Sequence, residues 1–292
     1  MKIATFLLRL FSRLPLSLLY VFSTFCFIFV YHIFRYRRHV VRGNIDRSFP
    51  ELSEKKRRLI ELRFYRFFCD YVVETIKLQT ISPEEMRQRM IMEGMDEVEH
   101  ALKDHPFVFV YLGHYCNWEC VSSLPLWQKE ESTHCAQLYR PLKNKWSDDL
   151  FNNMRSRFGS ENISKYDALR RILAMKKEGT KGVIGFISDQ TPSRNNIHHW
   201  VNFLHQDTPV VSGTERIARK VNAAVFFADV QRIKRGYYRL VYRPITLDVA
   251  AMPEYALTEL YMSELEKMIR RQPHLWLWSH KRWKHQRDLS IE

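Results

Sequence analysis

Glycine and proline are scarce in this chain, and internal repeats are missing. Only 9 glycines and 11 prolines occur among 292 residues, which excludes collagen-like and low-complexity proteins. No segment of roughly 20 to 50 residues recurs, so a solenoid is excluded as well. The hydrophobic share of 46% and the aromatic share of 14% are too high for a disordered chain. A globular protein remains, long enough to bury a sizeable core.

Several signatures of catalysis are also missing. The chain has neither a G-x-S-x-G nucleophile elbow nor a phosphate-binding P-loop. Its five cysteines are an odd number in a long chain, which is typical of reduced thiols. A cluster of histidine and cysteine matches no common zinc spacing, so we expect no metal and no cofactor, with a metal site there as the alternative: His114, Cys116, Cys120, His134 and Cys135. Without a nucleophile motif, direct attack by an activated substrate hydroxyl is the natural chemistry.

The positive charge lies at the two ends of the chain. Residues 1–48 hold eight basic side chains and one acidic one, and residues 270–287 hold six basic side chains and none acidic. Together they carry nearly all of the formal net charge of +14. Concentrated basic segments indicate an anionic partner, which could be a lipid surface, a phosphorylated substrate, an acidic protein or a nucleic acid.

An uncharged run near the N-terminus predicts a membrane anchor. It extends from Leu14 to Phe34, 21 residues without a formal charge, and would span ~30 Å as a helix, the thickness of a bilayer core. The bulky run is followed at once by Arg35, unlike a signal peptide, and a buried core helix is the alternative. We expect residues 1–42 to form the anchor, either spanning or lying in the interface. The slight excess of bases after the run favours a cytoplasmic catalytic domain.

The rest of the chain, residues 43–292, predicts one α/β domain with a largely parallel central sheet flanked by helices. Two helices come first, at 53–78 and from Ser82 onward, and a helix at 253–271 comes last. Apolar runs alternate with amphipathic segments between them, as in parallel sheets. The expected strands are 106–112, 134–139, 182–188 and 223–230, with 237–242 as a hairpin partner of the last; the expected helices are 144–158, 165–178 and 212–222.

Polar residues follow three of these strands. Ligands bind at the carboxyl ends of the strands in an open α/β sheet. The segment from Gly113 to Glu119 follows the first strand, Arg140 follows the second, and Asp189 and Gln190 follow the third. We therefore expect the functional site at this edge.

His114 and Glu119 are the candidate catalytic pair. Five positions apart on one helix, their side chains would point ~140° away from each other. If the chain turns after Gly113 and Glu119 lies in the first turn of the next helix, the carboxylate can reach the imidazole. Glutamate would then orient the ring while its other nitrogen takes a proton from a hydroxyl. A purely structural histidine is the alternative.

The ordered set of motifs resembles a known family. An anchor, the stretch VRGNIDRSFPE at 41–51 and a strand ending in G-H-x-x-x-x-E resemble the late (lauroyl/myristoyl) acyltransferases of lipid A biosynthesis, in the glycerolipid acyltransferase superfamily. The likeness continues in order through 139–142, 155–159, 188–190, Phe203 with 208–210, and 272–283. It departs from the family at 278–281, where many members show a His-Arg-Arg run, and in the 190–202 loop.

The resemblance implies a glycerol-3-phosphate acyltransferase-like fold and a membrane-bound O-acyltransferase of the bacterial inner membrane. It implies acyl transfer from acyl carrier protein to a hydroxyl of a lipid A precursor. His114 matches the general base and Glu119 its partner. Arg155 matches a basic position of the active site and Asp189 an acidic one, and we expect Arg140 and Gln190 to bind substrate with them.

Partners and alternatives follow from charge. An acidic acyl carrier protein and a phosphorylated glycolipid would both be drawn to basic patches near an anchor. Trp276, Trp278 and Trp283 lie among the C-terminal bases and suggest seating at the membrane interface, with a solvated basic face as the alternative. Two other functions stay open: acyl transfer to a lysophospholipid or aminolipid, and a membrane-tethered nucleic-acid binder. The latter lacks any recognised nucleic-acid-binding signature.

Overall fold

The computed structural model describes residues 2–287 and contains a seven-stranded sheet in the order β1-β9-β8-β2-β5-β3-β4. All neighbouring strands are parallel except β8 and β9, which form the expected antiparallel hairpin. The α/β class and the mostly parallel sheet are therefore confirmed. The strands are β1 (Met90–Glu93), β2 (Phe107–Leu112), β3 (His134–Tyr139), β4 (Glu161–Ser164), β5 (Gly182–Ile187), β8 (Ala224–Lys234) and β9 (Tyr237–Thr246).

Strand β2 lies near the middle of the sheet because every one of its residues is apolar. All six are buried, and the strand pairs with β5 on one side and β8 on the other. A continuous apolar run of this kind is typical of a strand covered on both faces. Two strands of this sheet, β1 and β4, are absent from the prediction; they are four-residue strands at its two edges with mixed polarity.

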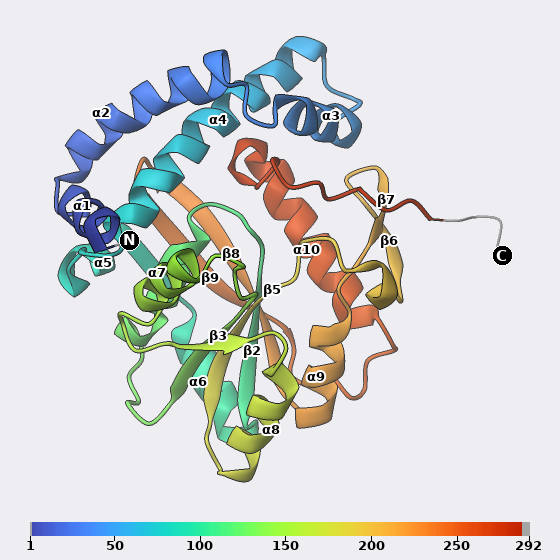
Figure 1. Ribbon diagram of the computed structural model, residues 1–292. Coiled ribbons are helices and arrows are strands. Elements are labelled where there is room, and N and C mark those ends of the chain that lie inside the picture. Colours follow the sequence, from blue (N-terminus) through green and yellow to red (C-terminus); the bar gives the residue numbers. More distant parts are fainter. Residues whose placement is uncertain (1, 288–292) are drawn as a thin grey trace.

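Helices lie on both sides of the sheet (Figure 1). The three helices expected between strands are present, each with ends within three residues of the predicted ones: α7, α8 and α9. The helices of this part are α5 (Pro83–Arg89), α6 (Met95–Asp104), α7 (Lys145–Arg155), α8 (Ala168–Lys177), α9 (Gly213–Val221) and α10 (Ala256–Arg271). Short 3-10 turns lie at Trp118–Leu126, Arg194–Asn196 and Pro273–Leu275.

The N-terminal helices α1 (Lys2–Ser12), α2 (Leu16–Phe27), α3 (Arg38–Ser48) and α4 (Glu54–Lys77) arch along one side of the domain (Figure 1). A π-helical turn, Ile28–Ile33, continues α2. Residues 16–33 form the one helical stretch within 2–287 that is long and apolar enough to cross a membrane by length and composition. Helix α3 runs through the predicted boundary at residue 42, and Asn44 donates to the carbonyls of Trp278 and His280.

A second, two-stranded sheet was not expected from the sequence. It consists of β6 (Trp200–Phe203) and β7 (Gln206–Pro209), joined by Leu204 and His205. Both joining residues have positive φ, 51° and 62°, a conformation that a two-residue hairpin turn needs and that Asn-Gly normally supplies. Glu266 of α10 accepts the Leu204 backbone N–H at 2.8 Å, which ties this turn to the main domain.

Candidate active site

The site lies where β2 and β5 end side by side. Gly113 follows β2, and a Cβ atom on it would come within 2.6 Å of the Leu265 side chain on α10. A larger residue at this position would have to displace the Leu265 side chain. The next residue, His114, and the residue two positions after β5, Asp189, therefore leave the sheet at the same edge.

His114 is held by Asp189. The imidazole Nδ1 lies 2.5 Å from Asp189 Oδ1, and the His114 backbone N–H donates to Oδ2 at 2.9 Å. The Trp276 indole donates to the same Oδ2 at 2.8 Å. Burial would raise the pKa of Asp189, but the His114 ring and these hydrogen bonds outweigh burial and lower it to about 2. Asp189 is therefore a carboxylate at neutral pH, and it fixes the ring of His114.

The other ring nitrogen of His114 faces Gln190. Nε2 lies 3.1 Å from the Gln190 side-chain nitrogen. Because Asp189 is acceptor-only, Nδ1 carries a proton, and in the neutral ring the lone pair lies on Nε2, towards the Gln190 amide. The His114 side chain keeps 18% of its surface exposed, against 2% for Asp189. A substrate hydroxyl can thus reach Nε2 by displacing the Gln190 amide.

The expectation that Glu119 orients His114 is wrong for this structure. The carboxylate of Glu119 accepts two hydrogen bonds from Arg155, at 2.7 and 2.6 Å, and one from the Trp118 indole at 3.2 Å. The chain turns sharply at Cys116, where φ is 53°, and continues as a 3-10 helix from Trp118. A bidentate arginine is a stronger partner for a buried carboxylate than a neutral imidazole, so Glu119 pairs with Arg155.

Trp118 joins the two pairs. Its ring contacts the His114 ring in an edge-on arrangement at 5.0 Å between centroids, and its indole N–H donates to Glu119. The Glu119–Arg155 pair therefore supports Trp118, and Trp118 supports the imidazole. Neither Trp118 nor Trp276 was singled out as a site residue from the sequence, although both lie in segments that carry the family resemblance.

The C-terminal segment packs against the loop that carries His114 and forms backbone hydrogen bonds with it. The Leu277 backbone N–H donates to the His114 carbonyl at 3.1 Å, and the Cys116 N–H donates to Leu275 at 3.0 Å. Trp276 and Trp278 are buried, with 3% and 0% of their surfaces exposed. The expectation that they sit at the membrane interface is wrong, since both pack in the core beside the site.

The remaining predicted residues are dispersed. Arg140 is exposed at the end of β3, and within residues 2–287 no side-chain hydrogen bond joins it to His114, Asp189 or Glu119. Three of the five residues of the suspected metal cluster, Cys116, Cys120 and Cys135, are buried free thiols. In the described part of the chain, no three histidine, cysteine or acidic side chains converge as a metal ion would require.

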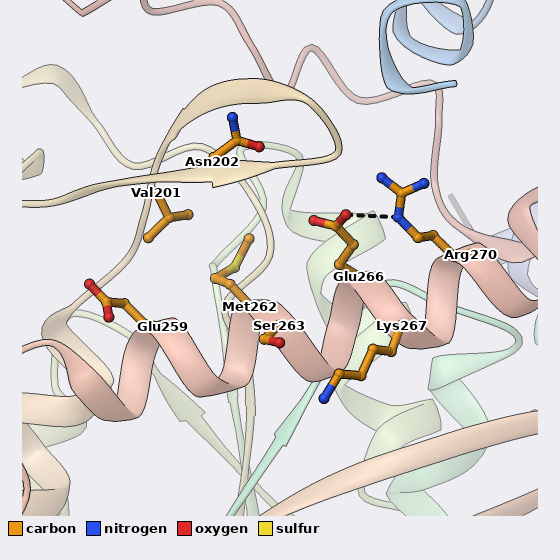
Figure 2. A pocket seen from close by; sticks show the side chains of 8 residues that line it. All are labelled: Val201, Asn202, Glu259, Met262, Ser263, Glu266, Lys267 and Arg270. Carbon is orange, nitrogen blue, oxygen red and sulfur yellow. Dashed lines mark hydrogen bonds and ion pairs between the residues drawn. The ribbon is translucent and has the colours of Figure 1, made fainter. Parts of the chain in front are cut away.

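A cavity of about 500 Å³ lies between α10 and the β6–β7 hairpin (Figure 2). Its lining includes Glu259, Glu266, Lys267 and Arg270, with Glu266 bonded to Arg270. Charges of both signs make it a poor site for an acyl chain. None of the six residues predicted for the site lines it.

Comparison of the sequence with known proteins identifies its family. The sequence model of one protein family, the bacterial lipid A biosynthesis acyltransferases, matches residues 2–285 of this chain. A lipid A biosynthesis palmitoleoyltransferase of Escherichia coli (strain K12) and a lipid A biosynthesis acyltransferase of Shigella flexneri are each 26% identical over 253 residues, 85% of this chain and 79% of theirs. Lipid A biosynthesis acyltransferase 2 of Shigella flexneri is 18% identical over 236 residues, 80% of this chain and 74% of its own. The chain therefore belongs to the bacterial lipid A biosynthesis acyltransferase family.

Proposed function

We propose that this protein transfers a fatty acyl chain from acyl carrier protein to a hydroxyl of a phosphorylated lipid A precursor, at the cytoplasmic face of the bacterial inner membrane. The observation that carries the proposal is the His114–Asp189 pair, whose Nε2 meets, among the described residues, only the Gln190 amide. An imidazole that is oriented by a buried carboxylate and reachable from solvent can act as the base that deprotonates a hydroxyl.

The chemistry needs no covalent enzyme intermediate. The acceptor hydroxyl gives its proton to His114 Nε2 while its oxygen attacks the thioester carbonyl carbon. The tetrahedral intermediate then breaks its carbon–sulfur bond, and the proton on Nε2 passes to the leaving thiolate. The products are the acyl ester and the free thiol of the carrier. The Asp189 carboxylate stabilises the imidazolium between these steps.

Glu119 and Arg155 have a positioning role in this proposal. Their ion pair holds Trp118 against the His114 ring and keeps the 3-10 helix beside the loop. Gln190 marks the place of the acceptor hydroxyl, since its amide occupies the hydrogen-bonding position on Nε2.

Exposed bases beyond β3 support an acidic carrier as the donor. Arg140, Lys143 and Lys145 are exposed and follow the carboxyl end of this strand, the same edge at which His114 lies. Charge of this kind speeds the encounter with an acidic protein. The apolar stretch at 16–33 and the basic residues around it support residence at a membrane.

The test is acyl transfer by the purified full chain, followed by mass spectrometry of the lipid. The enzyme is given acyl carrier protein charged with a saturated acyl chain and a phosphorylated lipid A precursor. We expect the lipid to gain the mass of one fatty acid less one water, and His114→Ala to abolish that gain. Transfer to a lysophospholipid or an aminolipid, with none to the precursor, would replace the proposed acceptor.

A further inference from the structure

Helix α1 has its two faces reversed relative to a helix on a water-soluble domain. Its polar side faces the protein: the Trp146 indole donates to Thr5 at 2.7 Å, and Thr80 donates to the Ser12 carbonyl at 2.6 Å. Its apolar stripe faces outward, with four side chains each more than half exposed: Ile3, Phe6, Leu7 and Leu10. In a water-soluble protein the apolar stripe of a helix packs on the core. The exposed apolar stripe of α1 therefore indicates that an apolar medium or partner covers it.

Helix α2 and its π-helical extension expose a second apolar stripe. The opposite stripe, spaced by three or four residues, is buried: Leu16, Leu19, Ser23, Phe27 and Tyr31. It packs along α4, which runs beside α2 (Figure 1). The exposed stripe is 42–73% accessible and consists of Leu18, Val21, Phe22, Phe25, Ile28, Phe29, Ile33 and Phe34.

Charged residues of α4 contact the buried side of α2 along its whole length. The Lys77 ammonium donates to the Leu14 carbonyl at 3.1 Å. Tyr20 then donates to Glu74 at 2.8 Å, and Ser23 donates to Asp70 at 2.6 Å. Further along, the Arg66 guanidinium lies 5.4 Å from the centre of the Phe27 ring. These contacts hold α2 against α4, so any placement of α2 in a membrane also places α4.

The turn of the β8–β9 hairpin also lies on α2. The Arg235 guanidinium stacks 4.1 Å from the centre of the Tyr20 ring and forms an ion pair with Asp70 at 2.5 Å. At the turn, a Cβ on Gly236 would come within 2.1 Å of the Tyr20 hydroxyl. The backbone of this turn therefore lies against the Tyr20 side chain of α2.

We propose that α1 and α2 lie in the plane of one membrane leaflet, with both ends of α2 on the side of the catalytic domain. The partner of the two exposed stripes is a lipid surface. If α2 crossed the bilayer upright in this structure, the exposed guanidinium groups of Arg66 and Arg235, which contact α2, and the hairpin turn would be carried into the hydrocarbon. Charged side chains and irregular backbone exposed to lipid do not persist there. Lying in the plane, α2 keeps them all on the aqueous side.

Basic residues around the stripes fit this orientation. Arg9 and Arg13 precede α2, and Arg35 and Arg37 follow its extension; all four are exposed. Amphipathic helices that lie at the interface combine such bases with apolar side chains buried about 5–10 Å deep, and the bases attract anionic headgroups. Glu74 also accepts from Asn117, three residues after His114, at 3.0 Å, so the same helix that seats the membrane face holds the catalytic loop.

This inference rests on the proposed membrane function, but its first test does not use acyl transfer. Of the five cysteines only Cys26 is exposed, so Cys26→Ser provides a background for single new cysteines. Arg9→Cys lies before α2, His39→Cys lies after it, and Tyr166→Cys lies on the catalytic domain, 71% exposed. Spheroplasts expressing the full chain are treated with a membrane-impermeant maleimide, before and after permeabilisation.

We expect the three cysteines to behave alike, all protected in intact spheroplasts and all labelled once the membrane is opened. A spanning α2 would place Arg9→Cys on the side opposite to the other two. Labelling of Arg9→Cys with a pattern different from that of His39→Cys and Tyr166→Cys therefore overturns the proposal.

A second test measures depth directly. Nitroxide labels on Leu18→Cys, Phe25→Cys and Phe29→Cys are read in vesicles of phosphatidylethanolamine and phosphatidylglycerol. We expect equal depths, whereas an upright helix would separate the first and last by up to ~16 Å. Graded depths overturn the proposal, and so does a lack of lipid contact at all three sites. Acyl transfer is measured on the same samples. Transfer that persists when the depths are graded would contradict the proposed orientation and leave the proposed function standing.

Discussion

His114 and Asp189 lie 75 residues apart in the chain and meet at 2.5 Å at the ends of two neighbouring strands. The Asp189 carboxylate accepts hydrogen bonds from both the ring N–H and the backbone N–H of His114. The arrangement makes Asp189, and not Glu119, the group that sets the tautomer of the proposed base. The role of each acidic residue can be separated by experiment.

Asp189→Asn is expected to lower kcat by about 10²–10⁴ with little change in KM. An asparagine of the same size leaves the fold intact but can donate to Nδ1, so the ring adopts the tautomer without a free lone pair on Nε2. Steady-state kinetics with both substrates measure the split. His114→Ala serves as the reference, and wild-type kcat in Asp189→Asn would remove the aspartate from the mechanism.

Glu119→Gln is expected to destabilise the protein by up to about 3–5 kcal/mol, because it removes the negative charge that compensates the largely buried guanidinium of Arg155. The double variant Glu119→Gln with Arg155→Met should lose less than the sum of the two single changes. Urea unfolding in detergent provides the measurement. The matched control is Glu161→Gln, which breaks a more exposed pair with Arg171 and should cost about 0–1 kcal/mol. Additive single changes would contradict a coupled pair.

Activity is expected to survive chelation by EDTA without any added cofactor. The donor thioester is already activated, and the proton transfers proposed above use His114 alone. Assays before and after dialysis against EDTA provide the comparison. Loss of transfer that zinc restores would bring the histidine and cysteine cluster back as a metal site.

The sequence predicts the sheet well and the site only in part, for physical reasons. The apolar runs of β2 and β5 indicate buried strands, and their ends place His114, Asp189 and Gln190 at one edge before any contact is known. The partner of His114 depends on a contact 75 residues away, while Glu119 is close in sequence and of the right chemistry. The β6–β7 hairpin escapes prediction because Leu204 and His205 replace the residues that usually form its turn.

Two half-buried histidines near the site, His274 and His280, are expected to limit stability in mild acid. Burial lowers the pKa of His280 from 6.5 to about 4, helped by the nearby His114, Arg282 and Lys284 and opposed by Asp189. Between these pH values the unfolded chain binds a proton that the folded protein does not. The free energy of unfolding therefore falls as the pH is lowered from 6.5 towards 4, by up to ~1.4 kcal/mol per unit for this group.

His280→Gln removes that titrating group while keeping a polar side chain of similar length. The variant should lose less stability than the wild type between pH 6.5 and 4. Urea unfolding at a series of pH values gives both slopes. Burial also lowers the pKa of His274 to about 4. His274→Gln should therefore reduce the slope of unfolding free energy against pH as well. Identical slopes in the wild type and in both variants would mean that these rings bind protons at the same pH in the folded and the unfolded chain, so that burial does not lower their pKa.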